Sequence, residues 1–269
     1  MIYIATHKKF EVPSVDGYVP IYVGAEGKQK LGYLSDNTGE NISKKNKNYC
    51  ELTGMYWVWK NTQDEYKGMV HYRRYFSNSL RKKYILKEST IKNILKKYDV
   101  ILPFSVSLKK SLTEDFCEIS GYKKDLDSVR NIIESKYPEY ITTYDKIMNG
   151  NKIYFYNMLI ASKSVFDNYC EWLVNILFEL EKHIDLTDYN EYQKRIYGFI
   201  SERLLNVYFE HNKYKVFECG VINTEENWNC WKKIRTALKR KIMFVIHILA
   251  CTIYILAPSV FVICNSIIL

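Results

Sequence analysis

The sequence predicts an α/β fold in which helices flank a mixed, mainly parallel sheet, followed by a C-terminal hydrophobic membrane segment. Short β-type runs alternate along the chain with longer segments of helical periodicity, which is typical of such sheets. Hydrophobic residues make up 47% and charged residues 26% of the 269 residues, with only 11 Gly and 5 Pro. This composition excludes disordered, collagen-like and linker-rich proteins. We therefore expect one domain over residues 1–231, a basic run over 232–241 and an anchor over 242–269.

Strands are expected where runs rich in β-branched and aromatic residues are bounded by turn residues. Pro103 ends the expected strand at residues 99–102. In a mainly parallel sheet the carboxyl ends of the strands share one edge, where ligands bind. Polar side chains that follow a strand are therefore the first candidates for a functional site. The expected strands cover residues 1–5, 20–23, 67–72, 99–102, 154–160 and 215–219.

Helices are expected where apolar residues recur with a period near 3.6. The clearest case is residues 164–182, which carry an i, i+3, i+4, i+7 stripe formed by Phe166, Tyr169, Trp172, Leu173, Ile176, Leu177 and Leu180. Pro138 closes another helix. The remaining expected helices cover residues 50–60, 89–97, 123–136 and 190–210.

The positive charge is concentrated near the C-terminus. The formal net charge is +9, and six cations without an intervening acid lie within residues 232–241, which leaves 9 − 6 = +3 for the rest. This run precedes the uncharged stretch 242–269, and by the positive-inside rule it places residues 1–231 at the cytoplasmic face of the cell membrane. Pro258 leaves open whether the segment spans or re-enters. The alternative is a buried C-terminal helix behind a solvated charge run.

Several familiar motifs are absent. Neither a G-x-G-x-x-G loop, a P-loop, a G-x-S-x-G elbow nor an H-E-x-x-H string occurs, and no aromatic-interleaved basic stripe indicates a nucleic-acid partner. The seven scattered Cys form no C-x-x-C pair, which fits a reducing cytoplasm. The D-x-D string Asp125-Leu126-Asp127 falls inside an expected helix, where a solvated helix face competes with a metal role. Participation of a divalent metal ion, Mn²⁺ or Mg²⁺, therefore stays open.

The strand expected at 67–72 leads into the cationic residues His71, Arg73 and Arg74. Strand alternation would place His71 and Arg73 on one side and Arg74 on the other. Arginine presents a planar fork that matches phosphate oxygens, and such cations can stabilise negative charge that develops on a phosphate. We therefore expect these residues to bind a donor phosphate. The alternatives are metal assistance by other carboxylates, arginines paired with structural carboxylates, and a core histidine.

His7 and Lys8 directly follow the first expected strand. At the edge of an α/β sheet, these side chains would contact the base or a phosphate of a bound nucleotide. The alternative is an exposed edge with no ligand.

A carboxylate can act as a general base that deprotonates a substrate hydroxyl. In the last expected helix, Arg195 and Glu202 are seven residues apart and share a face. Glu202 is the first candidate for a catalytic base, followed by Asp36 in a polar loop and Glu51 at a helix start, while Arg195 is a further candidate for phosphate binding. For each carboxylate, a structural ion pair is the alternative.

Several strings carry a resemblance to a known family. They are LSDNTGENIS at 34–43, ELTGMYWVWKN at 51–61, GMVHYRRYF at 68–76 and QKRIYGFISERLL at 193–205, together with His7-Lys-Lys9, Val23-Gly-Ala25 and Asn157-Met158. Over residues 1–225 the sequence resembles the bacterial domain-of-unknown-function family numbered 4422, met in capsule and surface-polysaccharide gene clusters. The resemblance implies a GT-A-like glycosyltransferase with a Rossmann-type sheet, and some relatives are associated with galactofuranose transfer.

The resemblance also draws attention to Asn157 and Trp57 as contacts for the acceptor or a sugar. Trp57 could equally be a core residue of its aromatic helix. The leading hypothesis is an enzyme that moves a hexose, galactose or galactofuranose among the candidates, from a UDP-sugar to a lipid-linked oligosaccharide. The alternative is a non-catalytic subunit that binds a sugar nucleotide or a glycan in a polysaccharide-assembly complex.

Overall fold

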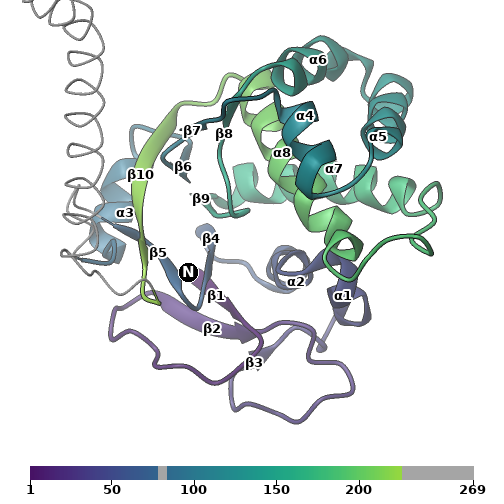
Figure 1. Ribbon diagram of the computed structural model, residues 1–269. Helices are drawn as coiled ribbons and strands as arrows, with labels where there is room; N and C mark the ends of the chain where they lie inside the picture. Colours follow the sequence, from purple (N-terminus) through teal and green to yellow (C-terminus); the bar gives the residue numbers. More distant parts are fainter. Residues whose placement is uncertain (78–83, 226–269) are drawn as a thin grey trace, which may run out of the picture. The chain divides into compact units, whose positions relative to one another are not determined.

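The computed structural model describes residues 1–77 and 84–225, and Met1–Asn223 form one compact unit (Figure 1). The expected basic run 232–241 and hydrophobic segment 242–269 lie outside the described residues. Within the described ranges, no helix is long and apolar enough to cross a bilayer.

A mixed sheet forms the centre of this unit. In the described part of the chain it has eight strands in the order β3-β2-β1-β4-β5-β10-β6-β9, and β9 also pairs with β4. A separate two-stranded sheet joins β7 (Val106–Ser107) and β8 (Lys152–Ile153). The strands of the main sheet are β1 (Ile2–Thr6), β2 (Tyr18–Tyr22), β3 (Leu34–Ser35), β4 (Tyr66–His71), β5 (Arg74–Ser77), β6 (Val100–Pro103), β9 (Leu159–Ser162) and β10 (Val216–Asn223).

Parallel and antiparallel pairings are equally frequent among these strands. β1 is parallel to β2 and β4, β2 to β3, and β6 to β10. β5 is antiparallel to β4 and β10, and β9 is antiparallel to β4 and β6. The sheet is therefore mixed as expected, but the prediction that it is mainly parallel is wrong. One cause is β5, which follows β4 after a tight turn, and a tight turn can join only antiparallel strands.

Helices lie on both faces of the sheet (Figure 1). Along β1, Ile2 and Ile4 belong to a core shared with Ile91 of α3, whereas Tyr3 and Ala5 belong to the core formed with α2 and α4–α8. Successive side chains of a strand point to opposite faces, so β1 contributes to both cores. The helices are α1 (Asn46–Tyr49), α2 (Leu52–Asn61), α3 (Glu88–Leu95), α4 (Leu112–Ile119), α5 (Lys123–Lys136), α6 (Ile141–Asn149), α7 (Lys163–Leu180) and α8 (Ile196–His211).

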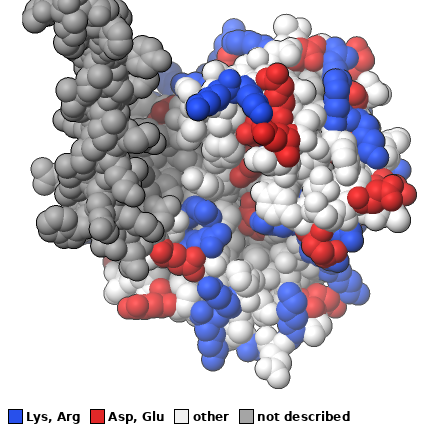
Figure 2. All heavy atoms as spheres, in the orientation of Figure 1, with Lys and Arg blue, Asp and Glu red and all other residues white. Residues whose placement is uncertain are grey.

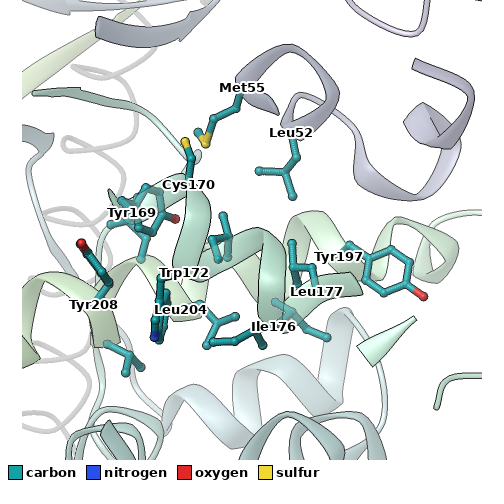
Figure 3. Close-up of a cluster of buried hydrophobic side chains, with 14 of the residues drawn as sticks. Leu52, Met55, Tyr169, Cys170, Trp172, Ile176, Leu177, Tyr197, Leu204 and Tyr208 are labelled. Carbon is teal, nitrogen blue, oxygen red and sulfur yellow. The ribbon is translucent and has the colours of Figure 1, made fainter. Parts of the chain in front are cut away.

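The larger core is organised around α7, which packs against α2 and α8. The apolar stripe expected on this helix is buried along its whole length. Ser162 caps the helix by accepting a hydrogen bond from the Val165 N–H at 3.5 Å. The helix expected at 164–182 is therefore confirmed. Figure 3 shows the cluster, in which α7 meets Leu52, Met55, Tyr197, Leu204 and Tyr208.

The strand expected at 154–160 is correct only in its last two residues. β9 begins at Leu159, because Tyr156 and Asn157 have φ angles of 82° and 51°. L-residues in a strand have negative φ, so the chain turns at these two residues. The turn changes the direction of the chain at the edge of the functional cleft described below.

The helix expected at 190–210 is shorter than predicted. Gln193–Arg195 form a 3-10 turn, and α8 begins at Ile196. Three of the described helices, α1, α4 and α6, were not predicted. For α4 the sequence carries a signal, since Ser111 and Glu114 form a capping box at its start.

Candidate active site

A cleft of about 820 Å³ opens at the carboxyl ends of β1, β2 and β4. This edge is where α/β sheets bind ligands, and small-molecule sites commonly enclose roughly 300–1,000 Å³. The end of β1, the α1–α2 junction, the β4–β5 turn, the end of α4, the loop before β9, and α8 all contribute side chains to the wall. Segments far apart in the sequence therefore meet at one site.

The β4–β5 turn brings cations to this cleft. β4 ends at His71, Tyr72 and Arg73 form the turn, and Arg74 begins β5 opposite His71. The expected alternation of these residues between two sides of one strand is wrong, because the backbone reverses and all four line the cleft. The Arg74 guanidinium lies 4.6 Å from the centroid of the Tyr156 ring. Cation–π contact of this kind orients the guanidinium while leaving its N–H groups able to bind an anion.

His7 lines the same cleft at the end of β1, whereas Lys8 is outside its wall. The His7 ring packs edge-on against Tyr72 with centroids 5.4 Å apart, and the Lys8 ammonium lies 4.8 Å from the centroid of that ring.

The His71 Nε2 atom donates a hydrogen bond to the Tyr156 carbonyl oxygen at 2.7 Å. Since a carbonyl oxygen only accepts, this contact fixes the hydrogen of the His71 ring on Nε2.

Glu202 projects from α8 into the cleft. Its Oε1 atom accepts a hydrogen bond from the Tyr156 N–H at 2.8 Å, and its Oε2 atom lies 3.4 Å from Nη1 of Arg203. The side chain is only 16% exposed. The pKa of Glu202 is raised to about 7, chiefly by burial and also by the negative charge of Glu51. Arg203, the Tyr156 N–H and Arg195 oppose this shift.

Arg203 was not singled out from the sequence. It is 2% exposed, donates through Nη2 to Asp115 Oδ2 at 2.7 Å and through Nη1 to the Phe199 carbonyl oxygen at 3.0 Å. A buried cation of this kind requires a partner, and Asp115 of α4 supplies it. The adjacent charges of Glu202 and Arg203 inside an otherwise apolar helix were the signal that could have revealed this pair.

Arg195 lies at the N-cap position of α8 and lines the cleft together with Glu202, as their spacing predicted. Its Nε donates to the Cys50 sulfur at 3.1 Å, and its guanidinium lies 5.6 Å from the centroid of the Phe199 ring. Burial raises the pKa of the Cys50 thiol to about 11, so this sulfur accepts as a neutral thiol at neutral pH.

Glu51 and Asn157 form a second polar contact at the cleft. Glu51 lies at the N-cap position of α2 and lines the wall. Its Oε1 atom accepts a hydrogen bond from Nδ2 of Asn157 at 2.7 Å. Asn157 itself is 1% exposed and lies behind the wall, so the structure places it next to a cleft residue and away from direct contact with a ligand.

Asp36 does not lie in the cleft. It is completely buried, and its carboxylate accepts hydrogen bonds from the Gly24 N–H at 2.7 Å, the Ala25 N–H at 3.0 Å and the Ser43 hydroxyl at 2.5 Å. These bonds join the loop after β2 to the segment before α1. The structure thus gives Asp36 a structural role and corrects its candidacy as a base, because a carboxylate with no access to substrate cannot accept its proton.

Trp57 is also placed away from the cleft. It is 8% exposed and belongs to the larger core, where its ring packs edge-on against Tyr3 with centroids 6.5 Å apart. Its Nε1 atom donates to the Thr38 carbonyl oxygen at 2.9 Å. The expected sugar contact is therefore corrected to the core alternative.

Both carboxylates of the D-x-D string pair with other residues of the protein. Asp125 accepts the Tyr122 N–H at 2.8 Å and the Tyr189 hydroxyl at 2.5 Å, and Asp127 pairs with Lys123 at 2.7 Å. Within residues 1–77 and 84–225, no three His, Cys, Asp or Glu side chains converge in a group that could hold a metal ion.

Charges of both signs are interspersed over the face shown in Figure 2. Elsewhere among the described residues many charges are paired, such as Arg130 with Asp145 at 2.8 Å and Lys136 with Glu179 at 2.8 Å. On this face the described residues form no continuous basic surface of the kind that follows a nucleic-acid backbone.

Fold and cleft together define a mixed α/β sheet protein whose site, at the carboxyl edge of parallel strands, combines cations with buried carboxylates. The family model described as Domain of unknown function (DUF4422) matches residues 1–213, and the chain belongs to this family.

The structure is similar to a solved one described as the apo structure of the bifunctional glycosyltransferase WbbM, with a TM-score of 0.79 and 31% sequence identity. The match covers 84% of this chain and 45% of that one, so the chain spans less than half the length of that protein. The fold is thus similar to that of a glycosyltransferase. No curated protein sequence matches the chain.

Proposed function

We propose that this protein is a glycosyltransferase that moves a hexose from a UDP-sugar to a hydroxyl group of a lipid-linked oligosaccharide in surface or capsular polysaccharide synthesis. One observation carries the proposal: Glu202, whose pKa is raised to about 7, shares a cleft with His71, Arg73 and Arg74 at the ligand-binding edge of the sheet. The likeness to a glycosyltransferase fold supports it. Galactose and galactofuranose are the hexoses we favour.

The cationic turn suits the donor diphosphate. The reaction breaks the bond between the anomeric carbon and the β-phosphate oxygen, and that oxygen keeps the electron pair. Charge therefore develops on the phosphate in the transition state, where Arg73, Arg74 and His7 stabilise it. Arg195 is a second cation on the wall formed by α8.

Glu202 suits the role of the base. The acceptor oxygen forms a new bond with the anomeric carbon while its proton moves to the Glu202 carboxylate. A base with a pKa near the working pH is both ionised to a useful extent and strong enough to take the proton. One such carboxylate fits a single displacement with inversion at the anomeric carbon.

Calorimetric titration of UDP into the full-length protein, once with Mn²⁺ and once with EDTA, tests the donor part of this proposal. Binding in EDTA would support phosphate recognition by the cations of the β4–β5 turn. Binding only with Mn²⁺ would support the enzyme class and show that a metal ion completes the site. No binding in either buffer would contradict the proposed donor.

Transfer assays separate the enzyme from a non-catalytic subunit. With UDP-hexose and a lipid-linked glycan, an enzyme releases UDP in proportion to product. If UDP-hexose binds but no product and no UDP form, a binding subunit of an assembly complex is the better description.

A further inference from the structure

Two consecutive residues at the cleft have unusual backbone geometry. Tyr156 and Asn157 have φ angles of 82° and 51°, in the left-handed region that non-glycine residues seldom adopt. Residues in this region carry backbone strain and persist only where surrounding contacts hold them. Tyr156, with its bulky aromatic side chain, is less expected in this region than Asn157. The contacts that hold these residues in place therefore require an explanation.

Tyr156 contacts three residues of the cleft wall. Its N–H donates to Glu202 Oε1 at 2.8 Å, and its carbonyl oxygen accepts from His71 Nε2 at 2.7 Å. Its ring lies 4.6 Å from the Arg74 guanidinium. One residue thus sets the orientation of the candidate base Glu202 and of His71 and Arg74 at the β4–β5 turn. An extended conformation at this residue would reorient its N–H and C=O and break these contacts.

Asn157 holds a fourth cleft residue. Its Nδ2 atom donates to Glu51 Oε1 at 2.7 Å and to the Gly198 carbonyl oxygen at 3.1 Å, and its Oδ1 atom accepts from the Ser201 hydroxyl at 2.9 Å. The amide orientation is unambiguous, since the opposite one would place two oxygens against each other at Glu51. The amide thus ties α2 to α8 and leaves Glu51 with one fixed orientation.

Glu51 is the carboxylate that the proposed mechanism does not use. It lines the cleft, and within residues 1–77 and 84–225 its second oxygen, Oε2, has no hydrogen-bond partner. The N-terminus of α2, where it lies, favours a negative charge. A carboxylate only accepts hydrogen bonds and repels phosphate, so hydroxyl groups are the part of a sugar nucleotide or glycan that it suits.

We propose that Tyr156–Asn157 is the positioning turn of this cleft, and that Glu51, fixed by Asn157, is a second substrate-binding carboxylate that accepts hydrogen bonds from sugar hydroxyl groups. The inference rests on the proposed function, because it requires a sugar substrate. Glu51 contacts the substrate, while Tyr156 and Asn157 act through the residues that they hold. The sugar hydroxyl groups belong either to the donor hexose or to the acceptor glycan.

The test uses Glu51→Gln and Asn157→Gly in the full-length protein. Glycine adopts the φ of Asn157 without strain, so the second variant removes the amide and keeps the turn. Lys213→Gly is the matched control: Lys213 also has a positive φ, of 55°, but lies outside the cleft. Thermal unfolding of each variant checks that it is folded.

Affinities for UDP and for UDP-galactose are measured by calorimetry, and the KM for the acceptor is measured in transfer assays. We expect both variants to bind UDP as the parent does. If the donor hexose is the partner of Glu51, UDP-galactose binds about tenfold more weakly, as expected for loss of a hydrogen bond to a charged group. If the acceptor is the partner, donor affinity is unchanged and the acceptor KM rises about tenfold. Lys213→Gly changes none of these quantities.

The double variant Glu51→Gln/Asn157→Gly shows whether Asn157 acts through Glu51 or independently of it. If Asn157 acts through Glu51, the loss in the double variant equals that of Glu51→Gln alone, whereas independent roles give multiplied losses. Multiplied losses, or single variants within twofold of the parent in both measurements, would overturn the inference while leaving the proposed function intact. A parent protein that binds neither UDP nor UDP-galactose would overturn both.

Discussion

Glu202 combines burial with charged neighbours from several elements. Arg203 comes from the same helix, Arg195 from the turn before it and Glu51 from the start of α2. Burial dominates and raises the pKa of Glu202 to about 7, because removal of water disfavours its negative charge. The residue therefore changes charge close to neutral pH.

The first prediction is that Glu202→Gln lowers kcat by about 10²–10⁴-fold, the usual contribution of a general base. For the parent enzyme, kcat/KM should rise with pH and level off above about pH 7, since only the ionised Glu202 accepts a proton. Initial rates measured below and above pH 7 give both the kcat of the variant and the pH dependence of kcat/KM for the parent. A parent profile that is flat through pH 7 would argue against Glu202 as the base.

The same residue affects stability. Its pKa is near 4.5 without burial and about 7 in the folded protein, so the folded state binds this proton more tightly than the unfolded state does. The resulting stabilisation is complete below about pH 4.5 and is lost as the pH rises through about 7. Gln does not titrate, so the Tm of Glu202→Gln minus that of the parent should increase between pH 5 and pH 8. A pH-independent difference would contradict the raised pKa.

The second prediction concerns phosphate recognition. Arg74→Ala should weaken UDP binding by about ten- to a hundredfold, because hydrogen bonds to charged groups contribute roughly 1.5–3 kcal/mol. Arg130→Ala is the control, since Arg130 pairs with Asp145 outside the cleft. Calorimetry with UDP compares the two variants. Equal losses in both would show that general charge, and not the β4–β5 turn, determines binding.

At the scale of elements, local patterns located α2, α3, α5 and α7 and also β1, β2, β4 and β6, each within two residues. The helix expected at 123–136 coincides with α5, and that at 164–182 with α7 within two residues. β5 was missed because four residues after a tight turn carry no periodicity of their own. The turn at Tyr156 was missed because nothing in that string distinguishes left-handed backbone from extended backbone.

The third prediction tests the structural role of the loop after β2. Asp36→Asn replaces one acceptor oxygen with an N–H donor opposite hydrogen-bond donors, at Gly24, Ala25 and Ser43. We expect a loss of about 1–3 kcal/mol in the free energy of unfolding, measured by urea denaturation. The pH dependence of kcat/KM should stay that of the parent. A shift of its rising limb with unchanged stability would restore Asp36 as a candidate base.

At the scale of the whole molecule, the cleft and the proposed membrane attachment belong to different parts of the chain. The unit Met1–Asn223 contains the entire cleft. The attachment of residues 242–269 to the cytoplasmic face of a membrane stays a prediction from the sequence. Its purpose would be physical: confinement at a surface raises the effective concentration of a lipid-borne acceptor.

The fourth prediction follows from that separation. Deletion of residues 232–269 should leave UDP affinity unchanged and should lower the transfer rate to an acceptor embedded in vesicles. Transfer to a soluble acceptor analogue serves as the control and should be unaffected. Equal rates with both forms of acceptor, before and after the deletion, would exclude an anchoring role for the tail.

The sequence by itself located α2, α3, α5 and α7 and the cations that follow β1 and β4. Helical periodicity and position at a strand end are local properties of the chain. It also brought Glu202 forward as a candidate base. Only the tertiary structure decided that Glu51 faces the cleft while Asp36 and Trp57 are buried elsewhere. Burial and charged neighbours that come from distant segments set the protonation and orientation of a side chain, and these properties exist only once the segments are packed together.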